Sequence, residues 1–474
     1  MNILACYPPG EIFQRGEDRC QSNIKSSTAT SMRACNDLGY IAAQLRNKHQ
    51  ILLKDYQTEL LSYESMKKDV LGFHPDYIVI STTNATVFDD IKIVNQLKQD
   101  TNIQFKVILK GAIFFDAEQK LLDMLDLNNI DILVGGEIDC VIKDIINNTK
   151  PLNEIPCIFY KQDNHFIKTS ISWCHDLDLI PFPARDLMPN HLYTRPDTGE
   201  MMATIQTSRG CPSQCIYCLS PKISGKCIRY RSPQNVFEEL IDCYDNYNIK
   251  SFFFKADTFT MNEQWVLELC RLIKHSKLYK NISYTANSRV KPISERVLKA
   301  MKDTGCFTIA FGLETGNAET MKKIKKGVTI EDNYNAVHLA QKVGIPVYGF
   351  YMIGFPWETK EQINDTIKMI FELNCDFIEL HLALPYYGTE FYNICKNENT
   401  LNENVLGVDY FHSSTKGTKY VSNTDLIKIR KKALFKYHIR PNYIIHKLVT
   451  CKGNPKIIGN YIKYGIKLIL NIIR

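Results

Sequence analysis

The sequence contains no apolar run long enough to cross a bilayer, because even its most hydrophobic stretch, near the C-terminus, is interrupted by lysine and asparagine. It also has no recognisable secretory leader. Met1–Cys6 is a short apolar run that leads into Pro8 without a basic region before it. We therefore expect a cytoplasmic protein with reduced thiols, in which the 16 cysteines do not form a disulfide framework.

The chain carries little excess charge. It has 58 Lys and Arg against 51 Asp and Glu, and a net charge of +7 over 474 residues is weak support for a nucleic-acid partner. The apolar content of 45% and the charged content of 23% are typical of a soluble globular protein. A chain of this length predicts two or three domains.

Three cysteines lie unusually close together, at Cys211, Cys215 and Cys218. Their spacing is C-x3-C-x2-C, and they follow an apolar, β-prone stretch at 201–207, which predicts a loop at the end of a strand. A tight loop containing Gly210 can bring three thiolates to one inorganic cluster. Because a [4Fe-4S] cubane has four irons, three cysteines leave one iron open to another ligand.

A zinc site is the alternative for these cysteines, with Cys227 as the fourth ligand. Zinc sites usually combine two paired C-x2-C halves, and this stretch contains only one. The alternative function from a different class is therefore a zinc-stabilised, non-catalytic binding protein.

Residues 1–150 alternate strand-like and helix-like patterns, which predicts an α/β fold with a parallel sheet and helices on both faces. Ligands of such sheets bind at the carboxyl ends of the strands. The predicted strand ends are followed by small, hydroxyl and acidic residues: Ser81, Thr82, Gly111, Gly135, Gly136 and Glu137. By contrast, Asp89-Asp90 is interpreted as the charged start of a helix.

Residues 151–200 are rich in proline and are predicted to be a linker. Residues 201–400 repeat a strand-then-helix unit six times, which predicts a partial (β/α)6 barrel with its chemistry at the carboxyl ends of the strands. The expected strands are 201–207, 251–254, 282–286, 308–311, 347–352 and 377–382. Polar residues or glycine follow them, among them Asp257, Arg289, Glu314 and Gly354.

Residues 401–474 lose this alternation and are predicted to be helical. A helix at 424–435 leads to Tyr437-His438-Ile439-Arg440-Pro441, and residues 456–474 predict a helix with a narrow basic stripe and a broad apolar face. That face either docks on the protein or lies on a membrane surface, so peripheral membrane contact through 456–474 is one of two expectations.

The cysteine loop resembles the signature of the radical S-adenosylmethionine (SAM) superfamily, in which Tyr217 matches the aromatic residue before the last cysteine. In that family the open iron chelates the amino and carboxylate groups of SAM. The resemblance implies that Tyr217, Asp257, Arg289, Glu314 and Gly354 contact SAM. Alanine replaces the first acid of the family's Asp-Asp-x-Phe-Thr motif at Ala256, which leaves Asp257 as the expected contact.

Residues 1–150 are similar to the cobalamin-binding, Rossmann-like domain that precedes one class of radical SAM enzymes. The similarity rests on Pro8-Pro9, Leu38–Ala42, Phe73–Ser81 and Val134–Glu137. The sequence departs from cobalamin-dependent mutases in lacking the D-x-H-x-x-G motif, and from the class in having Lys110-Gly111 in place of Gly-Gly. The resemblance implies that cobalamin binds at Ser81, Thr82, Gly111, Gly135, Gly136 and Glu137.

Together these resemblances imply reductive cleavage of SAM to a 5′-deoxyadenosyl radical and, with cobalamin, methylation of an unactivated carbon of a small molecule or lipid. A flavodoxin-like or ferredoxin-like donor would supply the electron. Cyclisation or rearrangement by the same cofactors is an alternative. So is RNA methylthiotransfer with a second cluster at Cys6, Cys20 and Cys35, although these cysteines are too closely spaced and no nucleic acid is expected.

Overall fold

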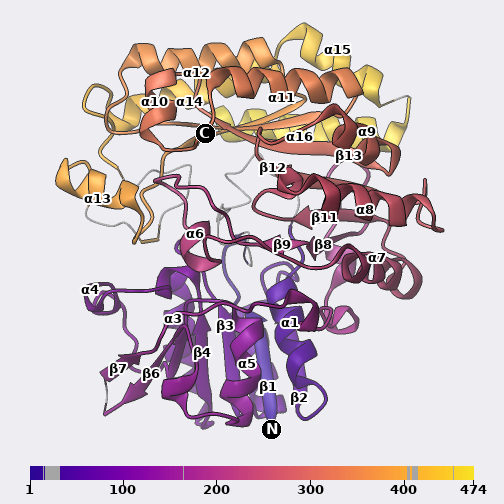
Figure 1. Ribbon diagram of the computed structural model, residues 1–474. Coiled ribbons are helices and arrows are strands. Elements are labelled where there is room, and N and C mark those ends of the chain that lie inside the picture. Colours follow the sequence, from indigo (N-terminus) through magenta and orange to yellow (C-terminus); the bar gives the residue numbers. More distant parts are fainter. Residues whose placement is uncertain are drawn as a thin grey trace.

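The computed structural model describes residues 1–13, 15, 32–163, 165–402, 406–407, 415–451 and 453–473. Figure 1 shows an N-terminal α/β part in indigo and purple, a barrel part in magenta and orange beyond it, and C-terminal helices in yellow against the barrel. The strand ends of the N-terminal sheet face the barrel, so the two parts meet at the edge where ligands of such sheets bind.

The N-terminal sheet has seven strands in the order β2-β1-β3-β4-β5-β6-β7. The first five are parallel, as predicted from their short apolar runs, whereas β6 and β7 are antiparallel. The sheet therefore continues past residue 150, where the sequence predicts a linker to begin. The strands are β1 (Asn2–Tyr7), β2 (Gln50–Asp55), β3 (Tyr77–Ser81), β4 (Lys106–Lys110), β5 (Ile132–Val134), β6 (Ile158–Gln162) and β7 (His165–Lys168).

Helices cover both faces of this sheet, and two hydrophobic clusters fill the space between the layers. A parallel sheet buried on both sides explains why its strands read as continuous apolar runs. The helices are α1 (Asn36–Leu45), α2 (Tyr63–Phe73), α3 (Val87–Thr101), α4 (Gln119–Leu122) and α5 (Ile138–Asn147).

Asp89 and Asp90 lie in the first turn of helix α3, as predicted for a charged helix start, and Asp90 has a further role. Its side chain is 1% exposed and accepts hydrogen bonds from both terminal nitrogens of Arg15, at 2.7 and 2.8 Å. Thr82 and Thr86 donate to it as well, at 2.6 and 2.8 Å. A buried carboxylate with this many donors is a structural anchor at the end of β3, because each donor offsets part of the cost of burying the charge.

The second sheet is the predicted partial barrel: six parallel strands in the order β15-β14-β13-β12-β11-β8. Alternate residues face the helices and the interior, as the two-residue period of a strand requires. The strands are β8 (Met202–Gln206), β11 (Ser251–Lys255), β12 (Ser283–Ser288), β13 (Cys306–Glu314), β14 (Val347–Ile353) and β15 (Phe377–Leu382).

Helices on the outside of the barrel pack on one large hydrophobic cluster. Several start with a side-chain cap, such as Thr329 and Thr359, each of which completes a capping box. A short two-stranded sheet, β9 (Ser208–Arg209) with β10 (Arg229–Tyr230), flanks the cysteine loop. The helices are α6 (Ser220–Ile223), α7 (Pro233–Tyr247), α8 (Glu263–Lys274), α9 (Glu295–Asp303), α10 (Ala318–Lys323), α11 (Ile330–Val343) and α12 (Lys360–Leu373).

The C-terminal region is helical, as predicted. Tyr437 donates a hydrogen bond to the carbonyl of Cys375 beside β15, so the segment around Tyr437 packs back on the barrel. Among the described residues, no helix is long and apolar enough to cross a membrane. The helices are α13 (Glu390–Asn397), α14 (Asn423–His438), α15 (Pro441–Thr450) and α16 (Pro455–Ile473).

Helix α16 uses one face to dock on the barrel. The Asn460 amide donates to the carbonyl of Asp197 at 2.7 Å, and the ring of Tyr461 stacks on Phe377 with centroids 6.5 Å apart. The opposite face leaves Ile462, Ile466 and Leu470 about half exposed. The structure therefore confirms docking on the protein for one face and leaves an apolar second face uncovered by the described residues.

Candidate active site

The cysteine loop leaves the barrel directly after β8 and β9. Gly210 adopts a φ of +93°, and a Cβ there would lie 2.2 Å from the carbonyl oxygen of Cys227, so only glycine fits this turn. The Cys211 N–H donates to the carbonyl of Gly225 at 3.0 Å, and the Cys218 N–H donates to the carbonyl of Cys215 at 3.2 Å. These backbone contacts hold the loop at the carboxyl end of the barrel.

The three thiols are not arranged as ligands of one metal ion. Within the described chain, no group of three or more His, Cys, Asp and Glu side chains converges on a single ion position. Cys227, the fourth ligand of the zinc alternative, is exposed. Three thiols that approach separate irons of a cluster, by contrast, do not have to meet at one point.

Charged side chains gather around Cys215. Burial raises the pKa of its thiol, Glu314 raises it further, and the cations Lys326 and Arg289 act in the opposite direction. Tyr217 is half-buried beside the same groups, and the pKa of its hydroxyl is raised well above 10 by burial and then by Glu314. Two cations next to a thiol favour the thiolate, which is the form that binds iron.

Arg289 and Glu314 lie close to the cysteine loop, and both contact Lys326. Arg289 donates to the Ser213 hydroxyl and to the Lys326 carbonyl. Glu314, at a φ of +61° at the end of β13, accepts a charge-assisted hydrogen bond from the Lys326 ammonium. Sequence reasoning missed Lys326, because it lies in a turn after α10 instead of at a strand end.

Gly354 follows β14 and is held by an acid that the sequence analysis did not single out. The Oε2 of Glu358 accepts the N–H of Gly354 at 2.7 Å and the N–H of Phe355 at 3.0 Å. Burial raises the pKa of Glu358 to about 7. The ring of Phe355 lies 6.2 Å from that of Tyr217, which brings this turn to the cysteine loop.

Asp257 lies after β11, where the sequence predicts it. The Ser220 hydroxyl at the start of α6 donates to its Oδ1 at 3.2 Å. Because α6 directly follows the cysteine loop, Asp257 is tied to the loop from the neighbouring strand. The structure thus brings Tyr217, Asp257, Arg289, Glu314 and Gly354 to one end of the barrel.

The residues predicted to contact cobalamin lie at the carboxyl edge of the N-terminal sheet, and they make contacts within the protein. Ser81 donates to Asp37, and Thr82 donates to Asp90. Both oxygens of Glu137 accept hydrogen bonds from Arg229 of the barrel, at 2.7 and 2.9 Å.

The three glycines at this edge serve the packing of the chain on itself. A Cβ at Gly111 would lie 2.8 Å from Thr82, one at Gly135 would lie 2.4 Å from the backbone of Phe115, and one at Gly136 would lie 2.8 Å from Cys157. Each glycine is therefore required by a neighbouring protein segment, and not only by a bound ligand.

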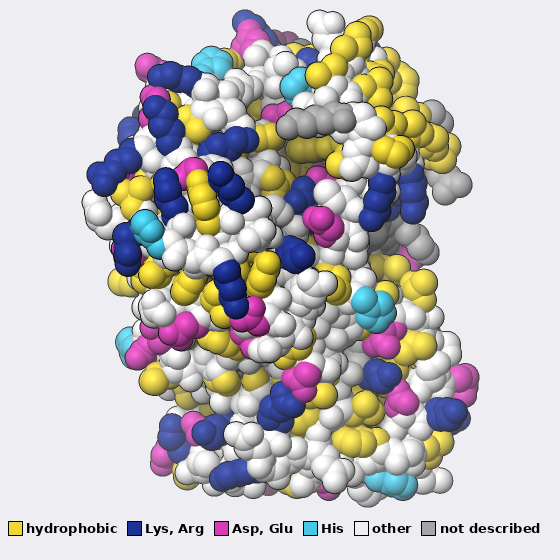
Figure 2. Space-filling view, turned by 90° about the vertical axis from the view of Figure 1, so that its right-hand side faces the viewer, with side chains coloured by type: hydrophobic (Ala, Val, Ile, Leu, Met, Phe, Trp, Pro, Cys, Tyr) yellow, Lys and Arg dark blue, Asp and Glu magenta, His cyan; other side chains and the backbone are white. Residues whose placement is uncertain are grey.

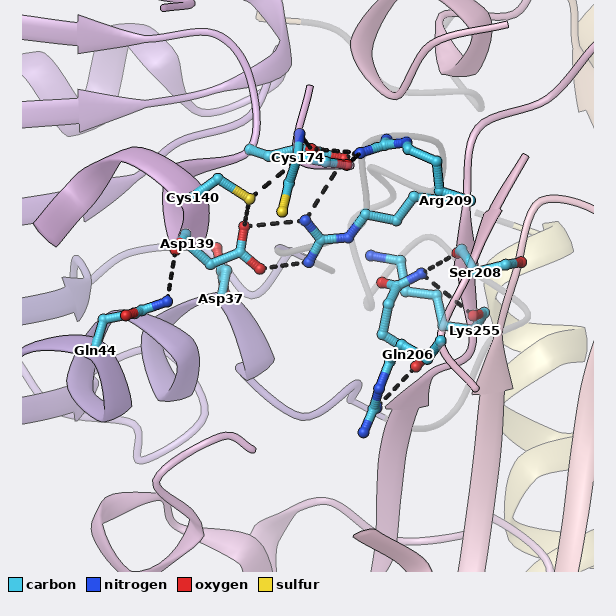
Figure 3. A network of polar contacts seen from close by, with 12 residues as sticks. Asp37, Gln44, Asp139, Cys140, Cys174, Gln206, Ser208, Arg209 and Lys255 are labelled. Atoms are coloured by element: carbon cyan, nitrogen blue, oxygen red, sulfur yellow. Dashed lines mark hydrogen bonds and ion pairs between the residues drawn. The ribbon is translucent and has the colours of Figure 1, made fainter. Parts of the chain in front are cut away.

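A cleft of about 960 Å³, partly open to solvent, lies between the N-terminal sheet and the barrel. Its two walls are joined by ion pairs, among them Arg209 with Asp139 (Figure 3). Asn36 lines the cleft, and its Oδ1 is buried without a hydrogen-bond partner among the described residues. The lining also includes Asp37, Lys110, Glu137, Gln206 and Lys255.

The interior of the barrel carries a further polar group, on β14 and β15. Tyr348 donates to Glu379 at 2.9 Å, and Glu379 shares a second hydrogen bond, at 2.8 Å, with Nε2 of His381. Val347, next to Tyr348 on β14, and Leu380, between Glu379 and His381 on β15, belong to the outer hydrophobic cluster, so these polar side chains face inward. The polar alternation in the sequence of β15 could have revealed them.

Comparison with known proteins agrees with this geometry. Residues 205–370 match the family model of the radical SAM superfamily. The chain is also 30% identical over 461 residues to the uncharacterized methyltransferase PH0819 of Pyrococcus horikoshii, with 96% of each chain covered. This chain belongs to the radical SAM superfamily.

This radical SAM protein is also similar to two proteins whose names give two different reactions, a cyclisation and a methyl transfer. It is 23% identical to the anaerobic magnesium-protoporphyrin IX monomethyl ester cyclase of Synechocystis, over 83% of this chain and 81% of the relative. Its fold is similar to that of the radical SAM methyltransferase TsrM from Kitasatospora setae, solved with cobalamin and a [4Fe-4S] cluster bound. The TM-score is 0.65 and the identity 13%, over 85% of this chain and 79% of TsrM.

Proposed function

We propose that this radical SAM enzyme transfers a methyl group to an unactivated carbon of a small molecule or lipid, using a [4Fe-4S] cluster, SAM and cobalamin. The observation that carries the proposal is the cysteine loop at the carboxyl end of the barrel, next to a cleft between the barrel and the N-terminal sheet that Arg209, Ser220 and Asp257 line. That arrangement offers one space, partly open to solvent, to a SAM site and to a second large cofactor.

The donor set at the cysteine loop fits an iron–sulfur cluster with one open iron. Cys211, Cys215 and Cys218 would hold the cluster, which supplies a low-potential electron to SAM when bound. Lys326 and Arg289 oppose the effect of burial on the pKa of the Cys215 thiol, and Glu314 accepts a hydrogen bond from Lys326 at the same place. Asp257, Arg289, Glu314 and Gly354 would contact SAM, with Tyr217 against it.

The cleft between the two sheets fits cobalamin in the chemistry of its lining. The buried Oδ1 of Asn36 accepts hydrogen bonds and has no donor among the described residues, and the peripheral amides of a corrin supply such donors. Asn36 itself is fixed, because its amide nitrogen donates to the carbonyl of Thr204 at 2.7 Å. When bound there, cobalamin supplies the methyl group. The predicted contacts Ser81, Thr82, Gly111, Gly135, Gly136 and Glu137 form the sheet edge below.

The barrel interior would orient the substrate. Tyr348, Glu379 and His381 form a hydrogen-bonded group on its wall, beside the ring of Phe350. Such a wall suits a molecule that is apolar with one polar group, because the rings provide apolar contact area and the acid and imidazole recognise a hydrogen-bonding end. The protein would also exclude water from the reacting carbon.

The C-terminal helices support the proposal that the enzyme works at a membrane surface. From Leu426 to Arg474 the sequence contains 12 Lys and Arg and no Asp or Glu, so the remainder of the chain has 46 basic and 51 acidic residues. The +12 of the last 49 residues thus exceeds the net charge of the whole chain. Anionic lipids attract such a segment, and each basic residue near the surface contributes about 1 kcal/mol of binding free energy.

The same region exposes large aliphatic side chains. They lie on α15 and on the outer face of α16, and the hydrophobic side chains at the upper right of Figure 2 gather at this end of the molecule. An apolar face beside many lysines is typical of helices that lie in the interface of a bilayer. The exposed residues are Ile444, Ile445, Leu448, Val449, Ile462, Ile466 and Leu470.

Vesicle sedimentation tests the membrane contact. The full chain is expected to bind phosphatidylglycerol vesicles, to bind phosphatidylcholine vesicles less, and to lose binding at high salt. The double variant Val449→Glu, Ile466→Glu should lose it as well. Leu179→Glu, at a residue 79% exposed elsewhere, is the matched control. Equal binding of all three proteins, or a dimer that only the double variant disrupts, would count against a membrane partner.

Anaerobic reconstitution with cobalamin, SAM and a reductant tests the methyl transfer. Formation of both 5′-deoxyadenosine and S-adenosylhomocysteine supports methylation. Deoxyadenosine alone would instead indicate cyclisation or rearrangement. Failure of the reconstituted protein to retain cobalamin would overturn its role. A low-potential flavodoxin-like or ferredoxin-like donor would take the place of the chemical reductant in the cell.

A further inference from the structure

Two free cysteines meet at the junction between the N-terminal sheet and the barrel. Cys140 lies in the first turn of α5, and Cys174 lies in the segment that leaves β7. Figure 3 shows their sulfur atoms close to one another, and the Cys174 thiol donates to the carbonyl of Asp176 at 3.3 Å. They come from segments far apart in sequence that meet only through the fold.

The surroundings hold both cysteines in place. The Cys174 N–H donates to Oε2 of Glu137 at 3.0 Å, and the Cys174 carbonyl accepts a hydrogen bond from Arg229. The sulfur of Cys140 lies 3.9 Å from the same Glu137 oxygen and 3.7 Å from Oδ1 of Asp139. Both cysteines therefore contact the same carboxylate oxygen, Oε2 of Glu137, which holds them at one place in the junction.

This junction adjoins the cysteine loop. Arg209, two residues before Cys211, donates to both carboxylate oxygens of Asp139, one at 3.0 Å. Arg229, which follows the loop, binds Glu137. The first turn of α5 thus holds the chain on both sides of the predicted cluster site, and Cys140 belongs to that turn.

The pKa of one of the two thiols is lowered, which favours its reactive thiolate form. The neighbouring Cys140 thiol lowers the pKa of Cys174 to about 7, with help from Arg209, while burial, Glu137 and Asp139 oppose this change. The pKa of Cys140 is raised by its neighbour Cys174 and by burial. A thiolate beside a protonated thiol is the arrangement of an attacking and a resolving cysteine.

We propose that Cys140 and Cys174 form a reversible disulfide that locks the junction beside the cysteine loop when the cell is oxidised. The oxidant is a low-molecular-weight disulfide. The Cys174 thiolate attacks one of its sulfurs, which forms a mixed disulfide and releases one thiolate. Cys140 then loses its proton and attacks the Cys174 sulfur, which releases the second thiolate. The two protein thiols together lose two electrons, and the small disulfide gains them and is reduced to two thiols.

The test uses the reduced full chain without cofactors, treated anaerobically with oxidised glutathione, blocked with iodoacetamide and digested without reductant. Mass spectrometry is expected to find a peptide pair joined through Cys140 and Cys174, and dithiothreitol should release it. Between pH 8 and pH 6 the rate should fall about tenfold, because that is the loss of thiolate for a pKa of about 7.

Variants make the outcome specific. Cys140→Ser should stop at the glutathione adduct of Cys174, and Cys174→Ser should abolish the reaction of Cys140. Cys157→Ser, at a third free cysteine of the same domain, is the matched control and should leave the crosslink intact. Separate alkylation of Cys140 and Cys174 in the wild type, or a Cys174 bridge to Cys157, would overturn the proposal. Because no cofactor or substrate is used, the result is independent of the methylation assay.

Discussion

The substitution Glu358→Gln is expected to stabilise the barrel at alkaline pH. Glu358 is fully buried, and its Oε2 accepts two backbone N–H groups from the turn after β14. Its Oε1 is buried without a hydrogen-bond partner among the described residues, so a proton on that oxygen relieves an unsolvated charge. Burial accordingly raises the pKa from 4.5 to about 7.

The sign and size of the effect follow from linkage. The folded state binds the proton more tightly than the unfolded state, so the contribution of Glu358 to stability is fully present below pH 4.5 and is lost as pH rises through 7. The complete loss is about 3 kcal/mol, and about 2 kcal/mol of it falls between pH 5.5 and pH 8. Glutamine keeps an oxygen for the two N–H groups and does not ionise.

Urea denaturation followed by tryptophan fluorescence measures this difference, since Trp265 and Trp357 both lie in the barrel. The wild type should lose about 2 kcal/mol more than Glu358→Gln between pH 5.5 and pH 8. Glu361→Gln is the control, because Glu361 lies exposed in the first turn of α12, three residues further on, and its pKa is lowered. Identical pH dependence of the wild type and Glu358→Gln would refute the reasoning.

Two further substitutions test the packing that holds the site. Glu239→Gln should cost about 3–5 kcal/mol, because it removes the negative charge that neutralises the buried cations Arg185 and Arg231. Glu268→Gln, in an exposed pair with Arg271, should leave the free energy of unfolding nearly unchanged in the same urea titration. Gly210→Ala should reduce iron retention of the reconstituted protein at least about tenfold, because the added Cβ would clash with the Cys227 carbonyl. Gly344→Ala is its control, because Gly344 also has a positive φ but has no atom within 4 Å of the added Cβ. This control should cost only about 1 kcal/mol of stability and should retain iron. Similar losses in the paired variants would contradict these assignments.

Much of the fold could be predicted because its strands are buried on both sides. Continuous apolar runs such as Asn2–Tyr7 and Tyr77–Ser81 identify strands without an alignment. The antiparallel pair β6 and β7 was not predicted, because most of its residues are half-buried or exposed and alternate without a clear apolar face. Helix α2 was missed for a similar reason: its only buried residues are Met66 and Val70.

The candidate site was predicted as far as strand ends define it. The cysteine spacing located the loop, and Asp257, Arg289, Glu314 and Gly354 do lie at one end of the barrel. Lys326 and Glu358 could not be found in this way, because a turn after α10 and a turn after β14 bring them back to the loop only in three dimensions. Of the cysteines of the methylthiotransferase alternative, Cys20 lies outside the described residues, and Cys6 and Cys35 are buried in hydrophobic clusters.

The central claim is that Cys211, Cys215 and Cys218 hold an iron–sulfur cluster whose fourth iron binds SAM. The most direct test is iron and sulfide analysis of the anaerobically reconstituted protein, with electron paramagnetic resonance of its reduced form before and after SAM is added. We predict about four irons per chain, a spectrum that changes with SAM, and loss of both in each cysteine-to-alanine variant but not in Cys227→Ala. Zinc in place of iron, or a cluster that survives replacement of all three cysteines, would contradict the account.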